Sequence, residues 1–164
     1  HWSRSLGWYA MAMVDVLEVV PAEHPKTPWL QGRFKAFIDA TLTYQHNSGT
    51  WYQVTDLGSR EGNYLEASGT AMLTYAMAKG ASLKFLPEEY KAHAEKGFAG
   101  LLDQMISVNP ETNVISLEQV CAVAGLGGNP YRDGSFDYYM SEPIRANDAK
   151  GVGPFILAAH YLNK

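Results

Sequence analysis

The sequence has a single cysteine, Cys121, and only 18% of its 164 residues are charged. One cysteine excludes a disulfide within the chain and a metal site built mainly from cysteines. The net charge is -4, from 13 basic and 17 acidic side chains. No basic face that could neutralise phosphates is indicated, so we expect no nucleic-acid partner. No apolar run is long enough for a transmembrane helix, so no membrane partner is expected either.

Signatures of metal and cofactor binding are also missing. The five histidines are scattered without the spacing of metal ligands. The glycine-rich stretch 125–128 lacks the third glycine of a dinucleotide fingerprint, because Pro130 stands there, and no phosphate-binding loop or Gly-x-Ser-x-Gly nucleophile motif occurs. We therefore expect no metal and no cofactor. No targeting segment is recognised, which favours a cytoplasmic location, with the periplasm as the alternative.

Apolar periodicity predicts an all-α fold with short β-hairpins in its loops. The segments TWYQV (50–54) and NVISLEQV (113–120) follow polar turns and are each expected to form half of a small hairpin. Gly80 is expected to cap the third helix. The predicted helices cover residues 8–20, 28–44, 66–80, 87–106 and 150–162.

The predicted helices alternate between two kinds. Helices 8–20, 66–80 and 150–162 are apolar nearly all round, which predicts inner helices, whereas 28–44 and 87–106 are amphipathic and predict outer ones. Each inner helix begins with small residues, which would let helix ends approach closely. This repeat, with long loops at one end, indicates an α-solenoid or an α/α barrel. Two and a half hairpins do not close a barrel.

The first residues, HWSRSLGWY, gather the strongest candidates for ligand binding. Arg4 has a planar fork of donors that matches a carboxylate, and Trp2 and Trp8 could form walls for a sugar ring. The combination suits an acidic sugar. The structural alternative is that Trp8 packs in the core and Arg4 pairs with a neighbouring acid.

A second candidate is the loop around Tyr131, Arg132 and Asp133. Glycines and Pro130 exclude a helix there, and the three side chains could contact a ligand. Alternatively, Arg132 and Asp133 pair locally and pin the loop.

Several carboxylates precede or lie on the inner helices. Glu66 could be a catalytic acid, a ligand-binding group or a carboxylate that caps the following helix. Asn147 or Asp148 could cap the last helix. Asp15 and Glu18 are spaced to share one helix face, but the sequence identifies no acid pair for glycoside hydrolysis with confidence.

The chain resembles a known enzyme family in several blocks. WSRSLGWYAMAMVDVL resembles the W-x-R-…-G-W-…-D-x-L segment of unsaturated glycuronyl hydrolases, most closely glycoside hydrolase family 105, with family 88 related to it. Leu6 departs from this pattern, because the family usually has a polar residue there. The later blocks WYQVTD, EGNYLEASGTAML, AGLGGNPYRDGS, YYMSEP and NDAKGVGPF resemble that family in the same order.

The resemblance implies an (α/α)6 barrel, of which residues 1–164 would be the C-terminal half and one incomplete catalytic domain. It implies removal of the 4,5-unsaturated uronic acid that polysaccharide lyases leave at a non-reducing end. In that family an aspartic acid protonates the double bond and water adds at C5. Trp2, Arg4 and Trp8 are the matching site positions. The aspartate lies upstream of this motif, so no catalytic residue is assigned here.

The expected activity is therefore that of an unsaturated rhamnogalacturonyl hydrolase acting on pectin fragments, with this segment alone inactive. The expected partner is an oligosaccharide carrying an unsaturated uronate, bound by Trp2, Arg4, Trp8, Tyr131 and Arg132. One alternative is an unsaturated glucuronyl hydrolase acting on glycosaminoglycan-type fragments, and another is a non-catalytic helical-repeat module. Inner helices without their neighbours would expose apolar surface, so a homodimer is also considered.

Overall fold

The computed structural model describes all 164 residues, which form six α-helices, one short 3-10 helix and three two-stranded antiparallel sheets. The 3-10 helix η1 covers Thr55–Leu57. The helices are α1 (Ser3–Val19), α2 (Thr27–Leu42), α3 (Ala67–Ser82), α4 (Tyr90–Met105), α5 (Phe136–Ser141) and α6 (Ala149–Leu162). The strands are β1 (Trp51–Tyr52), β2 (Leu65–Glu66), β3 (Ile106–Val108), β4 (Ile115–Leu117), β5 (Val120–Cys121) and β6 (Ile144–Arg145).

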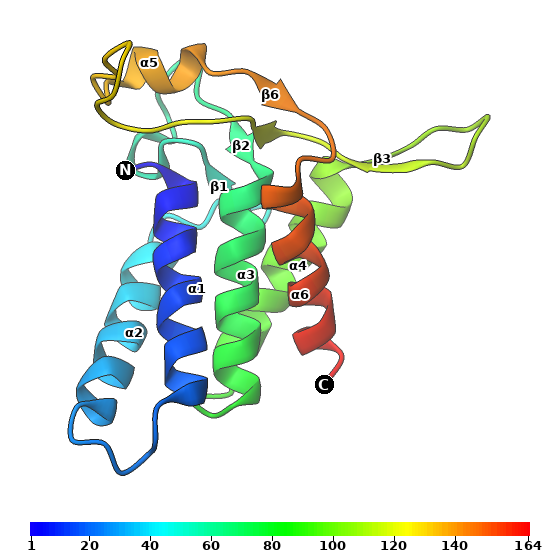
Figure 1. Cartoon of the computed structure of the whole chain (residues 1–164). Helices are drawn as coiled ribbons and strands as arrows, with labels where there is room; N and C mark the ends of the chain where they lie inside the picture. The colour runs from blue at the N-terminus through cyan, green and yellow to red at the C-terminus, as the bar shows by residue number, and fades with distance from the viewer.

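The helices form two layers (Figure 1). Helices α1, α3 and α6 run in the same direction, with α3 packed between the other two, and α2 and α4 pack behind them. The loops and small sheets gather at the end where these three helices begin. This arrangement is part of an α/α barrel and confirms the predicted alternation of inner and outer helices.

The starts of α1 and α3 lie unusually close together, as the small residues there predict. A Cβ atom added to Gly7 would lie 2.6 Å from the Cβ of Met72, and one added to Gly69 would lie 2.5 Å from the Oγ of Ser3. Such distances are shorter than non-bonded atoms tolerate. Glycine at these two positions therefore sets the spacing of the two helices.

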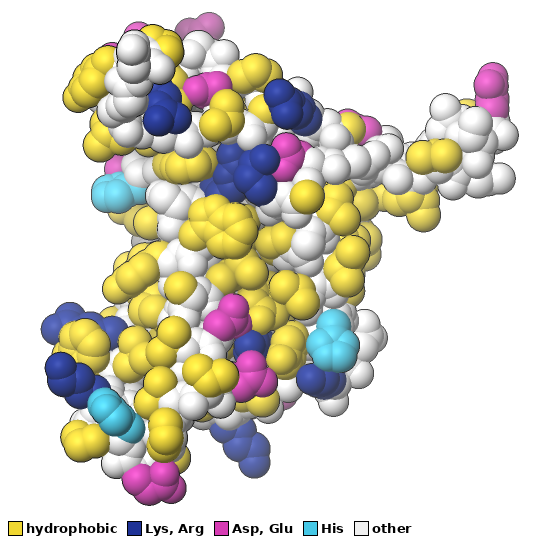
Figure 2. Space-filling view, in the orientation of Figure 1, with side chains coloured by type: hydrophobic (Ala, Val, Ile, Leu, Met, Phe, Trp, Pro, Cys, Tyr) yellow, Lys and Arg dark blue, Asp and Glu magenta, His cyan; other side chains and the backbone are white.

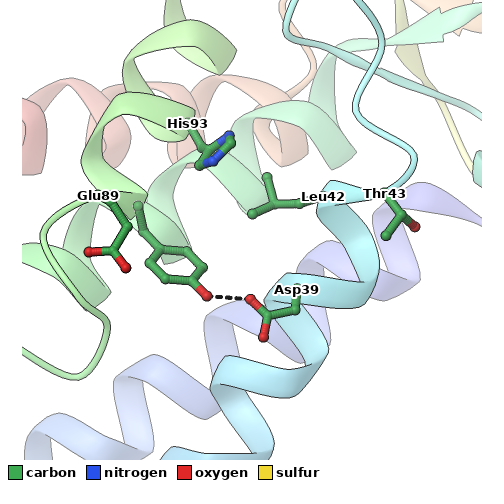
Figure 3. A pocket seen from close by; sticks show the side chains of 6 residues that line it. Asp39, Leu42, Thr43, Glu89 and His93 are labelled. Atoms are coloured by element: carbon green, nitrogen blue, oxygen red, sulfur yellow. Dashed lines mark hydrogen bonds between the residues drawn. The ribbon is translucent and has the colours of Figure 1, made fainter.

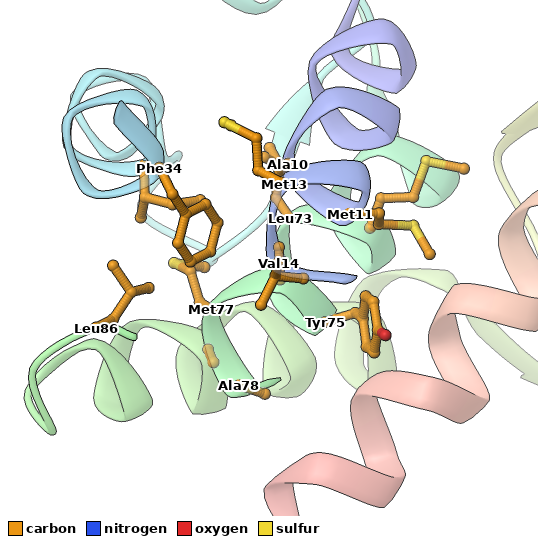
Figure 4. Close-up of a cluster of buried hydrophobic side chains, with 14 of the residues drawn as sticks. Ala10, Met11, Met13, Val14, Phe34, Leu73, Tyr75, Met77, Ala78 and Leu86 are labelled. Carbon is orange, nitrogen blue, oxygen red and sulfur yellow. The ribbon is translucent and has the colours of Figure 1, made fainter. Parts of the chain in front are cut away.

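The main core lies between the two layers (Figure 4). Met13 and Val14 of α1, Phe34 of α2 and Leu73 and Met77 of α3 belong to one buried cluster of 18 residues. Helix α3 is buried at every position from Ala67 to Ala81, as its apolar sequence predicts. Close packing of this kind is the dominant favourable contribution to folding.

Burial on most sides was also predicted for helix 8–20, and for α1 this prediction is wrong. One side of α1 packs on α3, but the side chains of Trp8, Tyr9, Val16 and Val19 are exposed. Ile156 of α6 is exposed as well. Figure 2 shows hydrophobic side chains over the face formed by α1, α3 and α6, with Lys and Arg near the loop end. No inner helix packs beyond α1 or α6 in this chain, so these faces meet solvent.

Several predicted boundaries are also wrong. Helix α1 begins at Ser3, so Arg4 lies in its first turn and not in a preceding loop. Helix α3 continues past Gly80 to Ser82. A Cβ at Gly80 would lie 2.9 Å from the side chains of Leu86 and Phe34, so only glycine fits there. Gly80 therefore serves packing and not capping.

The β-segments confirm the expected hairpins only in part. Strands β3 and β4 form a true hairpin that projects from the body of the molecule (Figure 1). Segment 50–54 contributes β1, which pairs with β2, and segment 113–120 contributes both β4 and the start of β5, which pairs with β6. These partners are distant in sequence. No helix is long and apolar enough to span a membrane.

Candidate functional site

The candidate site lies where α1 and α3 begin, beneath the loops. Trp2 is the N-cap residue of α1, and its backbone forms a bridge with Val54. The backbone N–H of Ser3 donates to the carbonyl of Gln53 at 2.9 Å. The segment around β1 thus fixes the start of α1, and with it the position of Arg4.

Arg4 is buried, with 1% of its surface exposed. Its Nη1 donates to the carbonyl oxygen of Cys121 at 2.5 Å, and its guanidinium carbon lies 5.1 Å from the centre of the Trp2 ring. No carboxylate of the chain forms an ion pair with Arg4. The alternative in which a neighbouring acid neutralises this guanidinium is therefore wrong. The charge of Arg4 helps to lower the pKa of the nearby Asp148 carboxyl, but no carboxylate contacts the guanidinium directly. Because a buried charge that is not directly paired is costly, this site favours an anion from outside the chain.

Glu66 is fully buried and is the N-cap residue of α3. Its carboxylate accepts hydrogen bonds from the backbone N–H of Gly69 at 2.6 Å and from the Ser68 hydroxyl at 2.7 Å. The capping role considered for Glu66 is confirmed. The carboxylate also accepts a 3.0 Å hydrogen bond from the backbone N–H of Cys121, a contact that the sequence does not indicate.

The two tryptophans differ in their surroundings. Trp8 is 46% exposed, so the alternative in which it packs in the core is wrong. The Trp2 ring is partly buried and lies 6.0 Å from the ring of Tyr139 in α5. Its indole Nε1 is buried and has no hydrogen-bond partner. Tyr139 was not predicted as a site residue, because only the fold brings α5 next to the start of α1.

The glycine-rich loop holds Arg132 against its own backbone. The Nε of Arg132 donates to the carbonyl of Gly127 at 2.9 Å, and a Cβ at Gly125 would lie 2.8 Å from the guanidinium. Asp133 accepts instead from the backbone N–H of Ser135 at 2.8 Å, and this contact lowers the pKa of its carboxyl group. The alternative in which Arg132 and Asp133 pair locally and pin the loop is therefore confirmed, with backbone groups of the loop as the partners of both side chains.

Tyr131 lies at the surface of this loop with 75% of its area exposed. Neither Tyr131 nor Arg132 makes a hydrogen bond, ion pair or ring contact with Trp2, Arg4 or Trp8. The structure thus brings Trp2 and Arg4 together, places Trp8 further along the same helix, and leaves the two loop residues apart from them.

A buried polar group that sequence reasoning missed lies beside Cys121. Both side-chain polar atoms of Gln53 and the hydroxyl of Tyr64 are buried near the Cys121 thiol and make no hydrogen bond with a nitrogen or oxygen atom. Burial raises the pKa of the Tyr64 hydroxyl, and burial likewise raises the pKa of the Cys121 thiol despite the nearby charge of Arg4. The Tyr64 hydroxyl and the Cys121 thiol therefore stay uncharged at neutral pH. Together with Gln53 they form a cluster of buried, uncharged polar side chains near the guanidinium.

The last inner helix is capped by Asp148, which confirms one of the two predicted capping residues. Its carboxylate accepts from the backbone N–H of Lys150 at 3.0 Å and pairs with the ammonium of the same residue at 2.7 Å. Burial alone would raise the pKa of Asp148, but the Lys150 contacts, together with the charge of Arg4, outweigh burial and the pKa is lowered. Asn147 is not the cap; its side chain binds the backbone N–H of Leu117 at 2.8 Å.

A separate pocket of about 410 Å³ lies on the outer layer, between α2 and α4 (Figure 3). Asp39 at its edge accepts a short hydrogen bond from the hydroxyl of Tyr90 and pairs with Lys35 at 2.9 Å. The charge of Asp39 is thus neutralised within the outer layer. This pocket lies on different elements from Trp2 and Arg4, and no three His, Cys, Asp or Glu side chains gather anywhere in the chain to hold a metal.

Comparisons with known proteins place the sequence and the fold of the chain among glycoside hydrolases. The chain is 40% identical over 163 residues to the "24.9 kDa protein in picA locus" of Rhizobium radiobacter, covering 96% of this chain and 69% of that protein. A solved structure of a Clostridium acetobutylicum glycoside hydrolase from family 105 superposes with a TM-score of 0.95 and 45% identity. That match covers 99% of this chain and 45% of the other, so the chain spans less than half of that enzyme.

The fold is shared more widely than the sequence. A structure described as a polysaccharide lyase matches with a TM-score of 0.70 at 23% identity, over 98% of this chain and 42% of the other, which shows the fold alone. The sequence model described as Glycosyl Hydrolase Family 88, by contrast, matches residues 1–164. The chain therefore belongs to glycosyl hydrolase family 88.

Proposed function

We propose that the native gene product is a glycoside hydrolase that removes 4,5-unsaturated galacturonic acid from the non-reducing end of lyase-generated rhamnogalacturonan oligosaccharides. The observation that carries this proposal is the guanidinium of Arg4, which is buried against Trp2 without a carboxylate partner. The substrate supplies the missing anion, because its carboxylate is attached to C5 beside the double bond. The family membership and the likeness to a family 105 enzyme support the same reaction class.

The proposed reaction is hydration followed by ring opening. An acid delivers a proton to C4 of the enol ether, water adds its oxygen to C5, and the resulting hemiketal opens and releases the sugar. Within this chain Arg4 would hold the carboxylate, while Trp2 and Trp8 would flank the ring and exclude water from it. Tyr131 and Arg132 would contact the leaving sugar from the loop. We assign the proton donor to an aspartate outside residues 1–164. We propose that residues 1–164 are part of one catalytic domain.

The finer substrate choice can be tested directly. The native gene product is incubated with an unsaturated galacturonyl-rhamnose disaccharide and, separately, with an unsaturated glucuronyl disaccharide from a glycosaminoglycan, and loss of absorbance of the conjugated double bond is followed. Turnover of the first substrate alone supports the proposal. Preference for the second favours the glucuronyl hydrolase, and turnover of neither, with retained sugar binding, favours a non-catalytic module.

The role of Arg4 is tested in the same assay. Arg4→Ala should lower kcat/KM by the equivalent of about 2–5 kcal/mol, the range for truncating one partner of a buried charge pair. Arg33→Ala on the exposed side of α2 is the matched control and should leave kcat/KM unchanged. Unchanged kcat/KM in Arg4→Ala would remove Arg4 from the site.

Residues 1–164 expressed alone should not hydrolyse either disaccharide, because we place the proton donor outside them. Catalysis by the segment itself would contradict that placement.

A further inference from the structure

Cys121 connects Arg4 to Glu66 through its backbone. Its carbonyl accepts the 2.5 Å hydrogen bond from Nη1 of Arg4, while its N–H donates at 3.0 Å to Oε1 of Glu66. Cys121 belongs to β5, which is held on its other side by Ile144 of β6. This one residue therefore carries the only hydrogen bond of the guanidinium and is itself held by the buried carboxylate.

The Glu66 carboxylate is anchored independently of this contact. Gly69 and Ser68, in the first turn of α3, donate to it at 2.6 and 2.7 Å. No Lys or Arg forms an ion pair with Glu66. The Ser3 hydroxyl of α1 adds a longer hydrogen bond of 3.5 Å. The shorter contacts show that the start of α3, the fully buried helix, sets the position of Glu66, and Glu66 transmits that position to Cys121.

Helix capping accounts for only part of this arrangement. A cap needs the contacts to Gly69 and Ser68. An aspartate, which is one of the residues preferred at N-caps, could make them. The contact to the N–H of Cys121 adds nothing to α3. What it does is fix the carbonyl that orients Arg4, and a guanidinium binds a carboxylate through two parallel hydrogen bonds only when its plane is correctly oriented.

We infer that Glu66 is a positioning residue, which acts through the Cys121 backbone to orient the Arg4 guanidinium for the substrate carboxylate. This inference rests on the proposed function of Arg4. Glu66 does not touch the substrate. Groups of this kind hold a binding side chain within the narrow limits that productive recognition requires.

The test uses Glu66→Asp in the native gene product. The shorter carboxylate keeps the cap and the charge but withdraws from Cys121, so KM for the unsaturated uronide should rise about tenfold while kcat changes little. The matched control is Thr70→Val in the same buried turn, where Thr70 bonds the carbonyl of Glu66 and the N–H of Trp51 without touching the carboxylate. It should lower stability and leave KM unchanged.

A double-mutant cycle with Arg4→Ala separates positioning from a general structural effect. If Glu66 acts through Arg4, Glu66→Asp has no further effect on kcat/KM in the Arg4→Ala background. Equal losses in both backgrounds would overturn the inference, as would an unchanged KM in the single variant.

The two proposals fail separately. If the unmodified protein turns over no unsaturated uronide, the proposed function falls, and the crystal structure of the Glu66→Asp variant then decides the positioning role. A guanidinium that keeps its contact with the Cys121 carbonyl overturns the inference, and a displaced one supports it. Glu66→Gln, which keeps the length but places an amide donor among N–H donors, repeats the measurements should Glu66→Asp not fold.

Discussion

The ammonium of Lys79 on α3 lies 2.7 Å from the carboxylate of Asp15 on α1, although only 3% of Lys79 is exposed. Glu18 contributes a second carboxylate at 2.6 Å, which confirms that Asp15 and Glu18 share one face. Burial by itself lowers the pKa of Lys79, but the hydrogen bonds that its ammonium donates to these carboxylates and to the Tyr75 hydroxyl outweigh burial, and the pKa is raised. Lys79 therefore stays charged inside the helical layer.

The Lys79 cluster should respond asymmetrically to substitution. Replacing both Asp15 and Glu18 by Asn and Gln leaves a buried ammonium without a counter-ion and should lower the free energy of unfolding by about 2 kcal/mol. Lys79→Met removes the buried charge and leaves two half-exposed carboxylates in water, so the change should stay below about 1 kcal/mol. Urea denaturation measures both, and equal losses would contradict this account.

Gly69→Ala should be destabilising because of Ser3. The new Cβ would lie 2.5 Å from the Ser3 Oγ and 2.8 Å from its carbonyl carbon, so α1 and α3 would have to separate at a cost of about 1–3 kcal/mol. Gly32→Ala is the control, since nothing lies within 4 Å of a Cβ there. It should stabilise α2 by up to about 1 kcal/mol. Thermal unfolding of both variants compares them, and a stable Gly69→Ala variant would mean that the helix starts are free to move apart.

Stability should decline at alkaline pH partly because of Cys121. Burial raises the pKa of its thiol above the value of about 8.5 in the unfolded chain. Its contribution is therefore complete below that value and is lost as the pH rises through the folded-state pKa. Unfolding free energies between pH 7 and 10 should fall less steeply in Cys121→Ala than in the unmodified protein, because about 1.5 units of that range lie above the unfolded thiol pKa. Parallel curves would exclude this contribution.

The contribution of Asp148 to stability should be lost at acidic pH and not at alkaline pH. Its lowered pKa means that its contribution is complete above the unfolded value of about 3.9 and is lost as the pH falls through the folded-state pKa. Asp148→Asn keeps a good cap and should flatten the acid limb of the stability curve, whereas Asp148→Ala should lose about 1 kcal/mol at neutral pH. Denaturant titrations at a series of acidic pH values test this, and an unchanged acid limb in Asp148→Asn would contradict it.

Residues 1–164 expressed alone should self-associate through the exposed face of α1. Trp8, Val16 and Val19 present apolar surface there, and contiguous patches of this kind favour association. Sedimentation velocity should show a dimer whose population rises with protein concentration. Trp8→Ser together with Val16→Ser should shift it to monomer, and a monomer at all concentrations before substitution would end the homodimer proposal.

The helical layers could be predicted because their signal is local. The all-round apolar composition of residues 67–81 indicates a buried helix whatever surrounds it, and Asp148 caps α6 with atoms two residues away. The extent of burial of α1 could not be predicted, because it depends on which neighbours are present. Helix ends were misplaced where packing, as at Gly80, outweighs the usual preference for glycine after a helix.

For the candidate site, the sequence could suggest individual residues but not the contacts between them. Trp2 and Arg4 could be named as candidates because aromatic and guanidinium groups are adjacent in the sequence. The partner of Arg4 is a backbone carbonyl 117 residues away, and any residue could supply such a group, so no sequence pattern marks it. The same holds for the Glu66–Cys121 contact and for the buried side chain of Gln53, which become visible only when the loops are folded over the helix starts.

The complete burial of α3 also determines how fast its amide hydrogens exchange with water. Its amide hydrogens can exchange with water only when α1, α4 or α6 moves away, since these helices enclose it. Exchange at Leu73 or Met77 therefore reports the opening of the whole helical layer, whereas exchange in the projecting β3–β4 hairpin reports local fluctuation. The carboxylate that holds Cys121 belongs to the residue that caps the start of this enclosed helix, so that contact should also persist until the layer opens.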